Sequence, residues 1–260
     1  MKTTNLLTVL TVAMISFSAC ANNGTEGSDN STESQEKAVI EQKKVQSVTF
    51  QGGTVVEVAL FSITSGMESV VNDDYFPKVM PVAAEYGLKP LITFQVVKVD
   101  IGEAPAQMVG FFQWPSIEAK KEFDQDPRYL KLRNIRNKAM NFLYLGYLDV
   151  QKTQTVEFTT ERIYDFFALW IDKSNAPKLD EYFQAVAPIA AQEYTFQLPH
   201  LEGNVIKEYG NYTPDAIGLG SWESLEAKDR FFRDERVSEK VPLREAATPY
   251  KDVLMLKPMI

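Results

Sequence analysis

The chain has 260 residues, a formal net charge of −8, one cysteine and one histidine. A single cysteine excludes a disulfide within the chain, and a single histidine excludes a multi-histidine metal site. An acidic chain without a stretch of mixed aromatic and basic residues is a poor nucleic-acid binder and a poor binder of anionic lipid surfaces. We therefore expect no nucleic-acid partner.

Residues 1–19 are predicted to be an export signal. Lys2 precedes an apolar run over residues 6–17, which is shorter than the ~20 apolar residues that a membrane-spanning helix needs. The run ends in FSAC, which resembles the lipobox of bacterial lipoproteins. The resemblance implies cleavage before Cys20, which moves the net charge from −8 to −9 as Lys2 is lost, and lipid attachment to the Cys20 sulfur. An ordinary signal peptide is the alternative.

The lipoprotein resemblance also implies a location in the cell envelope. Ala21 follows the cysteine, and in a Gram-negative cell this implies the outer membrane, facing the periplasm. Residues 20–43 are small and polar without apolar periodicity, so they cannot bury a core and are predicted to be a disordered tether. A flexible chain of this length keeps the rest of the protein within roughly 25–30 Å of its anchor.

An internal repeat dominates the remaining sequence. WPSIEAKKEFDQDPRY from Trp114 and WESLEAKDRFFRDERV from Trp222 share eight of sixteen positions at an offset of 108. DYFPKVMPVAA from Asp74 matches EYFQAVAPIAA from Glu181 at an offset of 107, and KVQSVTF matches KTQTVEF at 108. We therefore predict two copies, residues 44–151 and 152–260, with a one-residue insertion between Ala84 and Gly110.

Each copy is predicted to run β-α-β-β-α-β. Apolar, β-branched runs predict strands at 55–63, 91–99, 108–114 and 142–150 in copy one, and at 162–171, 216–222 and 249–257 in copy two. Apolar positions at helical spacing predict the first helix of each copy, with Pro81 and Pro188 expected to kink or restart it. Ser116 and Ser224 are expected to cap the helices that follow the third strands.

This order is that of a ferredoxin-like unit, which has one antiparallel sheet with helices on one face. The other sheet face must also be buried. The predicted fold is therefore α+β, with two tandem ferredoxin-like units packed sheet to sheet within one chain. We expect the chain to be a monomer that contains its own pseudo-dimer.

The run from Phe112 to Met140 resembles the end of a domain in the dimeric α/β-barrel superfamily, and is most similar to the family called domain of unknown function 1330. The shared features are the aromatic-Pro-Ser-x-Glu-Ala stretch, the acidic-Pro-x-Tyr turn and an arginine-bearing helix. The Arg-Gly-Gly of that family after its second strand is absent here, where ITFQVVKVD stands. The resemblance implies a pocket between sheet and helices in each unit, but membership of a fold does not choose a reaction.

Three matched pairs are candidate ligand-binding residues, namely Arg136 and Arg244, Tyr75 and Tyr182, and Trp114 and Trp222. An arginine in a pocket binds a carboxylate bidentately, and phenols can bind or protonate a substrate. Each pair also has a structural interpretation. The aromatic residues could belong to the core, and each arginine could pair with a carboxylate of the first helix such as Asp74 or Glu181.

Other chemistry lacks support in the sequence. His200, in QLPHLEGN, is predicted to lie in a loop as a structural or surface residue rather than as a haem ligand. No GxSxG, P-loop, Rossmann glycine run, CxxC or HExxH motif is present, so no cofactor or metal is expected. Three hypotheses follow: a lipid-anchored protein that binds a small molecule, a cofactor-free oxygenase or isomerase, or a protein-interaction module.

Overall fold

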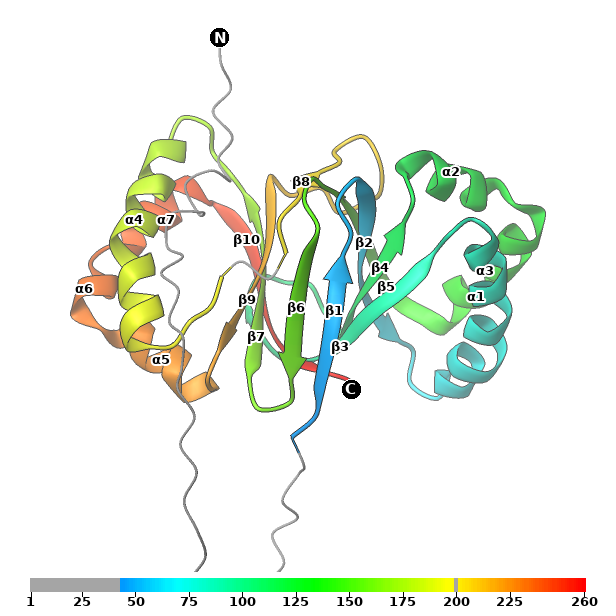
Figure 1. Cartoon of the computed structure of the whole chain (residues 1–260), viewed down its shortest axis with the longest axis horizontal. Coiled ribbons are helices and arrows are strands. Elements are labelled where there is room, and N and C mark those ends of the chain that lie inside the picture. Colours follow the sequence, from blue (N-terminus) through cyan, green and yellow to red (C-terminus); the bar gives the residue numbers. More distant parts are fainter. Residues whose placement is uncertain (1–42, 199–200) are drawn as a thin grey trace, which may run out of the picture.

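The computed structural model describes residues 43–198 and 201–260 (Figure 1). The predicted leader with Cys20, the predicted tether up to residue 42, and His200 lie outside the described residues. In the described part of the chain, no helix combines the length and the apolar character that a membrane crossing requires.

Copy one forms the predicted β-α-β-β-α-β unit. Its sheet has the antiparallel order β5-β2-β4-β3. The elements in chain order are β2 (Thr54–Ile63), a π-helical segment (Val70–Tyr75), α1 (Phe76–Glu85), β3 (Lys89–Ile101), β4 (Met108–Trp114), α2 (Ile117–Gln125), α3 (Pro127–Ala139) and β5 (Met140–Val150).

Copy two repeats this order, with its second strand reduced. The corresponding elements are β7 (Ile163–Trp170), α4 (Ala176–Glu193), β8 (Asn204–Val205), β9 (Ala216–Trp222), α5 (Leu225–Arg233), α6 (Glu235–Ser238), α7 (Val241–Ala247) and β10 (Tyr250–Pro258). Where β3 runs for 13 residues, β8 has two, and one isolated bridge joins Gln197 to Ser221 of β9. After this bridge the segment no longer pairs with β9, and β8 pairs with β5 of copy one instead.

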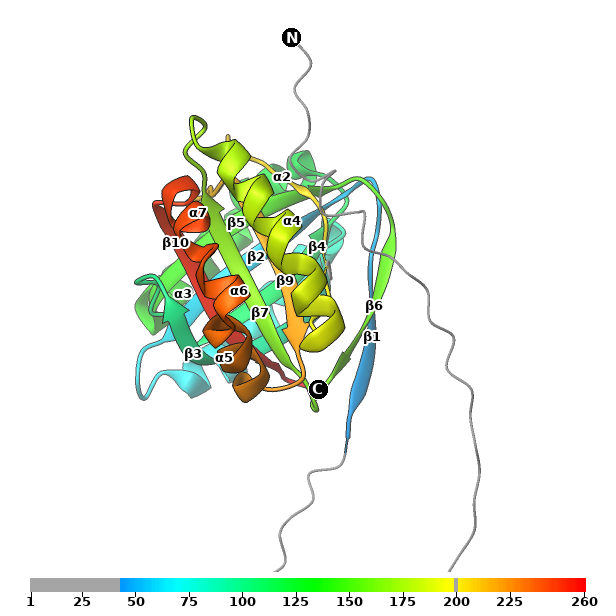
Figure 2. The same cartoon turned by 90° about the vertical axis from the view of Figure 1, so that its left-hand side faces the viewer.

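The two sheets join into one eight-stranded antiparallel sheet that is nearly closed. β3 pairs with β10, and the short β8 pairs with β5. The second strand of each copy therefore pairs with the last strand of the other copy. The helices of the two copies lie on opposite outer sides of the sheet (Figure 1). Turned by 90°, α4 and α5–α7 are seen to cover β7, β9 and β10 (Figure 2). The predicted sheet-to-sheet packing of two ferredoxin-like units in an α/β barrel is confirmed.

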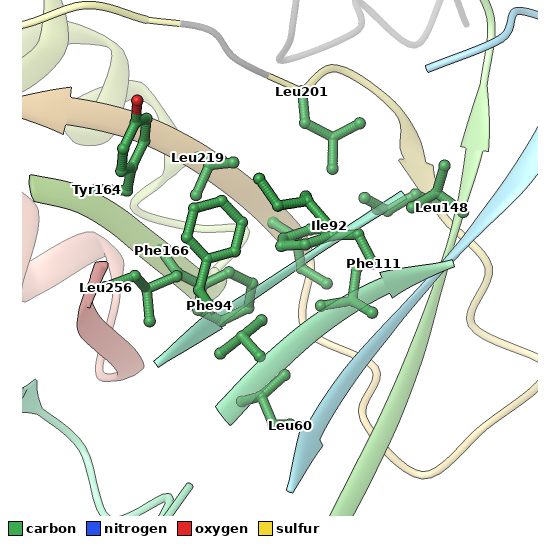
Figure 3. Packing of buried hydrophobic residues seen from close by; sticks show 14 of the residues in the cluster. Leu60, Ile92, Phe94, Phe111, Leu148, Tyr164, Phe166, Leu201, Leu219 and Leu256 are labelled. Carbon is green, nitrogen blue, oxygen red and sulfur yellow. The ribbon is translucent and has the colours of Figure 1, made fainter. Parts of the chain in front are cut away.

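The main core lies inside this barrel and draws on both copies. Figure 3 shows Phe94 and Phe111 of copy one beside Phe166 and Leu219 of copy two, and all four side chains are buried. Phe94 stacks edge-on against Phe111 and Phe158, with ring centroids 5.8 and 5.3 Å apart. Because the inner faces of both sheets contribute, neither copy encloses this core alone.

A two-stranded sheet covers one side of the barrel and was not predicted. β1 (Val45–Phe50) pairs antiparallel with β6 (Gln154–Thr159), so the matched leading segments of the two copies bond to each other (Figure 1). Phe50 and Phe158 point into the barrel core and are fully buried. The sequence shows that the two segments are related, but not that they are partners.

Local predictions for the helices had mixed outcomes. The hydroxyls of Ser116 and Ser224 accept hydrogen bonds from the third following backbone N–H, which confirms both caps. The expected restart at Pro81 and Pro188 is wrong, because both prolines lie inside continuous helices, while the alternative of a kink stays a prediction. The irregularity falls earlier, in the π-helical segment, where the Phe76 N–H bonds to the Val71 carbonyl five residues before it.

The one-residue insertion is located by a matched ion pair. Arg128 pairs with Glu85, and Arg236 pairs with Glu193, so the arginine and its partner both follow the offset of 108. Helix residues up to Ala84 match at an offset of 107, which makes Gln192 the extra residue. The division of the chain into two domains at residue 151 stays a prediction.

Candidate functional site

Each copy encloses a cavity between its sheet and its helices. Cavity one measures about 80 Å³ and cavity two about 110 Å³. A cavity needs on the order of 10–15 Å³ to hold one buried water, so each of these cavities has room for more than one. The predicted residues Tyr75, Trp114 and Arg136 line cavity one, and their counterparts Tyr182, Trp222 and Arg244 line cavity two.

The walls of both cavities are largely apolar. Helix and strand side chains form them because the sheet turns its outer face, rather than its barrel face, towards the helices. In cavity one these include Phe76, Val79, Met80, Phe112 and Leu143. In cavity two they include Leu179, Phe183, Val186, Phe196 and Phe232.

Both cavities contain a buried carboxylate that accepts a hydrogen bond from a buried tryptophan. The Trp114 indole donates from Nε1 to Glu57 Oε2 at 2.9 Å, and the Trp222 indole donates to Asp165 Oδ2 at 3.1 Å. The carboxylates lie on β2 and β7 and are related by the same repeat offset as the tryptophans. Burial raises the pKa of Glu57 and that of Asp165, against the opposing effect of a nearby lysine in each case.

That lysine is the third member of each set, Lys120 in cavity one and Lys228 in cavity two, and both are buried. Lys120 forms an ion pair with Asp124 at 2.6 Å, and its Nζ lies 5.6 Å from the centroid of the Trp114 ring. Asp124 also accepts a hydrogen bond from the hydroxyl of Tyr209, which belongs to copy two. Cavity one therefore takes one of its supports from the other copy.

Lys228 is held between two carboxylates. Its Nζ lies 3.3 Å from Asp165 Oδ1 and 3.0 Å from Asp100 Oδ2, and Asp100 belongs to β3 of copy one. Burial by itself would raise the pKa of Asp100, but bonds to Lys98 and Lys228 outweigh it and lower that pKa. Asp100 of copy one therefore lines cavity two, whereas Tyr209 of copy two supports Asp124 next to cavity one.

The arginines lie near the tyrosines of their cavities. Arg136 Nη1 donates to the Tyr129 hydroxyl at 2.8 Å, and burial raises the pKa of Tyr75 while Arg136 opposes that shift. The guanidinium of Arg244 lies over the Tyr182 ring, 5.7 Å from its centroid. The alternative salt bridges to the first helix are wrong. Asp74 pairs with Lys78, and Arg244 pairs with its neighbour Glu245 rather than with Glu181.

A further matched set has a structural role. Asp126 receives hydrogen bonds from the Tyr86 hydroxyl and from Arg128, and Asp234 receives the same bonds from Tyr194 and Arg236. These bonds hold the end of the first helix against the start of α3 in copy one and of α6 in copy two. They lie outside both cavities, and they account for the Asp-x-Arg match in the repeat.

The arrangement permits binding and proton transfer. A buried carboxyl with a raised pKa beside an apolar cavity can hold or accept a proton, and such groups are candidates for functional sites. Among residues 43–198 and 201–260, no group of three or more potential ligands could hold a metal ion. Tyrosine, tryptophan and arginine supply further polar groups to both cavity walls, and Lys251 and Asp100 add to that of cavity two.

Glu57 should make the stability of the protein depend on pH. A carboxyl whose pKa is raised in the folded state binds its proton more tightly there, so stability falls as the pH rises above the ordinary carboxyl value of 4.5. In Glu57→Gln, the amide oxygen can still accept from Trp114, and this loss should disappear. We expect the melting temperature of Glu57→Gln to rise relative to that of the unaltered chain as the pH increases from 5 to 8.

The matched control is Glu122→Gln, which removes an exposed carboxyl from α2. Its melting temperature should follow that of the unaltered chain at every pH. A Glu57→Gln curve parallel to that of the unaltered chain would show that Glu57 stays ionised in the folded protein over this range.

Sequence reasoning missed the carboxylates and the lysines. A single acid stands in each otherwise apolar first strand, at Glu57 and Asp165, and the two positions match at the offset of the repeat. Lys120 and Lys228 lie in the matched WxSxEAK motif. These signals were available. The contributions of Asp100 and Tyr209 across the copies carry no sequence signal.

Comparison with known proteins defines no family for the chain. No protein-family model matches it, and no curated protein sequence matches it. Solved structures with a similar fold include an anthrone oxidase-like protein, with 14% identity and a TM-score of 0.47, covering 81% of this chain and 94% of that one.

Two further structures extend this comparison. Chlorite dismutase from Candidatus Nitrospira defluvii has 12% identity and a TM-score of 0.45, covering 80% of this chain and 93% of that chain. A proposed monooxygenase from Fusobacterium nucleatum has 12% identity and a TM-score of 0.47, covering 81% and 94%. The assignment of this chain to the dimeric α/β-barrel fold rests on the strand order and packing described above.

Proposed function

We propose that this protein binds a small organic molecule in the cavities between its sheet and its helices, while lipid on Cys20 holds it in the cell envelope. The observation that carries the proposal is the pair of matched cavities. In both copies an apolar cavity retains a buried carboxylate, a tryptophan and a lysine, with an arginine and a tyrosine also in the wall.

Retention of these groups supports binding better than packing alone. Burying an ionised group costs several kcal/mol unless it is paired and hydrogen-bonded, so a purely structural wall has no need of one. An apolar cavity with a few convergent polar groups is typical of ligand sites. The proposal also includes a relationship to domain of unknown function 1330, a location at the outer membrane and a monomeric state.

A second candidate, catalysis without a cofactor, is favoured by one observation. Glu57 and Asp165 are buried carboxyls with raised pKa values next to an open apolar space, as a general base requires. An oxygenase or isomerase that removes a proton from a small organic substrate would use them. Binding is the prerequisite for this reaction, so the first experiment addresses binding.

Native mass spectrometry of the full chain, purified from the membranes of its own host, tests the proposal. We expect a mass increased by lipid on Cys20, and a further small ligand that is lost on denaturation. Cys20→Ser should lose the lipid mass and move to the soluble fraction while it keeps the ligand. A chain that carries no ligand and gains none from host extract would contradict the binding role. Retention of Cys20→Ser in the membrane at high salt would contradict the anchor.

A further inference from the structure

The matched arginines of the two cavities differ in the residue that follows each of them. Arg136 donates from Nε and Nη2 to the side-chain oxygen of Asn137 at 3.2 and 3.0 Å. Arg244 donates from the same two atoms to Glu245 at 3.1 and 2.8 Å. Asn137 and Glu245 occupy the same place in the repeat, each directly after its arginine. The geometry is therefore shared, but the partner is a neutral amide in cavity one and a carboxylate in cavity two.

This difference changes whether a carboxylate already occupies the donors of the arginine. Glu245 occupies the Nε and Nη2 donors of Arg244, and it is shared with Lys251, whose Nζ lies 2.6 Å away. Within the described ranges, no carboxylate oxygen lies within 4.0 Å of a nitrogen of Arg136 to form an ion pair. Its other bond goes to the uncharged Tyr129 hydroxyl. The positive charge of Arg136 is thus left without a negative partner.

The other charges of cavity one do not supply that partner. Lys120 and Asp124 are paired with each other at 2.6 Å. Glu57 accepts from the indole of Trp114, and burial raises its pKa towards the neutral form. A ligand that enters cavity one meets an apolar wall with a guanidinium in it, which matches an apolar body that ends in a carboxylate.

We propose that cavity one binds small apolar carboxylates through Arg136, and that cavity two excludes anions because Glu245 already occupies Arg244. This inference rests on the proposed binding function and names its ligand class. The identity of one residue, asparagine or glutamate after the arginine, sets whether the arginine can donate to a bound anion. A carboxylate at Arg136 would displace the exposed Asn137 amide and form two parallel N–H···O bonds.

A reciprocal exchange tests this proposal with two ¹⁹F probes, 4-(trifluoromethyl)benzoate and its uncharged amide, followed by NMR on the full chain. The unaltered chain should bind the benzoate at one site. Asn137→Glu should weaken benzoate binding at least tenfold and leave amide binding within twofold. Glu245→Asn should create a second benzoate site in cavity two. Asn137 is exposed, so Asn137→Glu should change the melting temperature little. Glu245→Asn removes the carboxylate partner of the buried Lys251 and should lower the melting temperature, so its binding is measured below that temperature.

Asn134→Glu is the matched control. It adds the same charge to an exposed position of α3 whose side chain does not accept a hydrogen bond from Arg136. It should leave both affinities within twofold. Equal weakening of benzoate and amide by Asn137→Glu, or no weakening of either, overturns the charge assignment and leaves the binding function standing. A chain that binds the amide but not the benzoate overturns the assignment as well. A chain that binds neither probe at 10 mM counts against both.

Discussion

Replacing Lys228 by methionine is expected to lower the free energy of unfolding by about 3–5 kcal/mol, because it leaves buried carboxylates without their cation. The ammonium lies 3.3 Å from Asp165 and 3.0 Å from Asp100, and its side chain is 4% exposed. Methionine has a similar length, so the loss of charge rather than of volume should dominate. Urea unfolding followed by circular dichroism measures the change.

The loss should grow with pH. Without Lys228, the pKa of Asp165 is expected to rise further, since burial raises it and the lysine opposes that shift. A raised pKa in the folded state removes stability as the pH rises above the ordinary value of 3.8. The defect of Lys228→Met should therefore be larger at pH 8 than at pH 5, and adding Asp165→Asn should restore part of it.

Lys120→Met is the matched control in copy one. Lys120 has one ion-pair partner, Asp124, which is 25% exposed and keeps the Tyr209 hydroxyl as a donor. Its loss should therefore be the smaller of the two. Equal stability of Lys228→Met and the unaltered chain at both pH values would mean that Asp165 is already neutral and that the lysine is not needed.

Gly210→Ala is the second substitution with a large expected effect. Gly210 has φ of +90°, and a Cβ there would lie 2.3 Å from the Leu145 carbonyl oxygen and 2.9 Å from the Tyr147 ring. A left-handed conformation costs a residue with a Cβ about 1–2 kcal/mol, and overpacking adds about 1–3 kcal/mol. We expect a total loss of about 2–5 kcal/mol from these two costs and displacement of the segment that carries Tyr209.

Gly66→Ala separates these two costs. Gly66 has φ of +82° with no atom within 4 Å of the added Cβ, so it should lose only the conformational part, about 1–2 kcal/mol. Comparing the two variants by urea unfolding gives the cost of the clash. Equal losses would show that the segment around Gly210 moves away from β5 freely.

The sequence predicts those parts of the fold that local patterns determine. The strands at 108–114 and 216–222 have the expected bounds, and Ser116 and Ser224 cap the expected helices. The second strand of copy two was harder to predict, because β8 pairs with β5 of copy one rather than with β9 of its own copy. The pairing of β1 with β6 is equally non-local, since it brings together the beginnings of two copies.

The candidate site follows the same division. Repetition alone selected Tyr75, Trp114 and Arg136 with their counterparts, and the structure gathers each set around one cavity. Glu57 was missed because strand periodicity does not show which face an acid occupies or that an indole covers it. The ligand that any of these residues binds stays a prediction.

The duplication also bears on how the two cavities can change over time. In a homodimer each substitution appears in both subunits at once, so both sites change together. Here the pseudo-twofold partner is encoded separately, and a mutation at Asn137 leaves Glu245 untouched. One cavity can therefore keep an ancestral ligand while the other acquires a new one. Asp100 of copy one pairs with Lys228 in cavity two, and Tyr209 of copy two donates to Asp124 next to cavity one. Each copy alone would lack one of these contacts, which opposes separation of the two copies into independent genes.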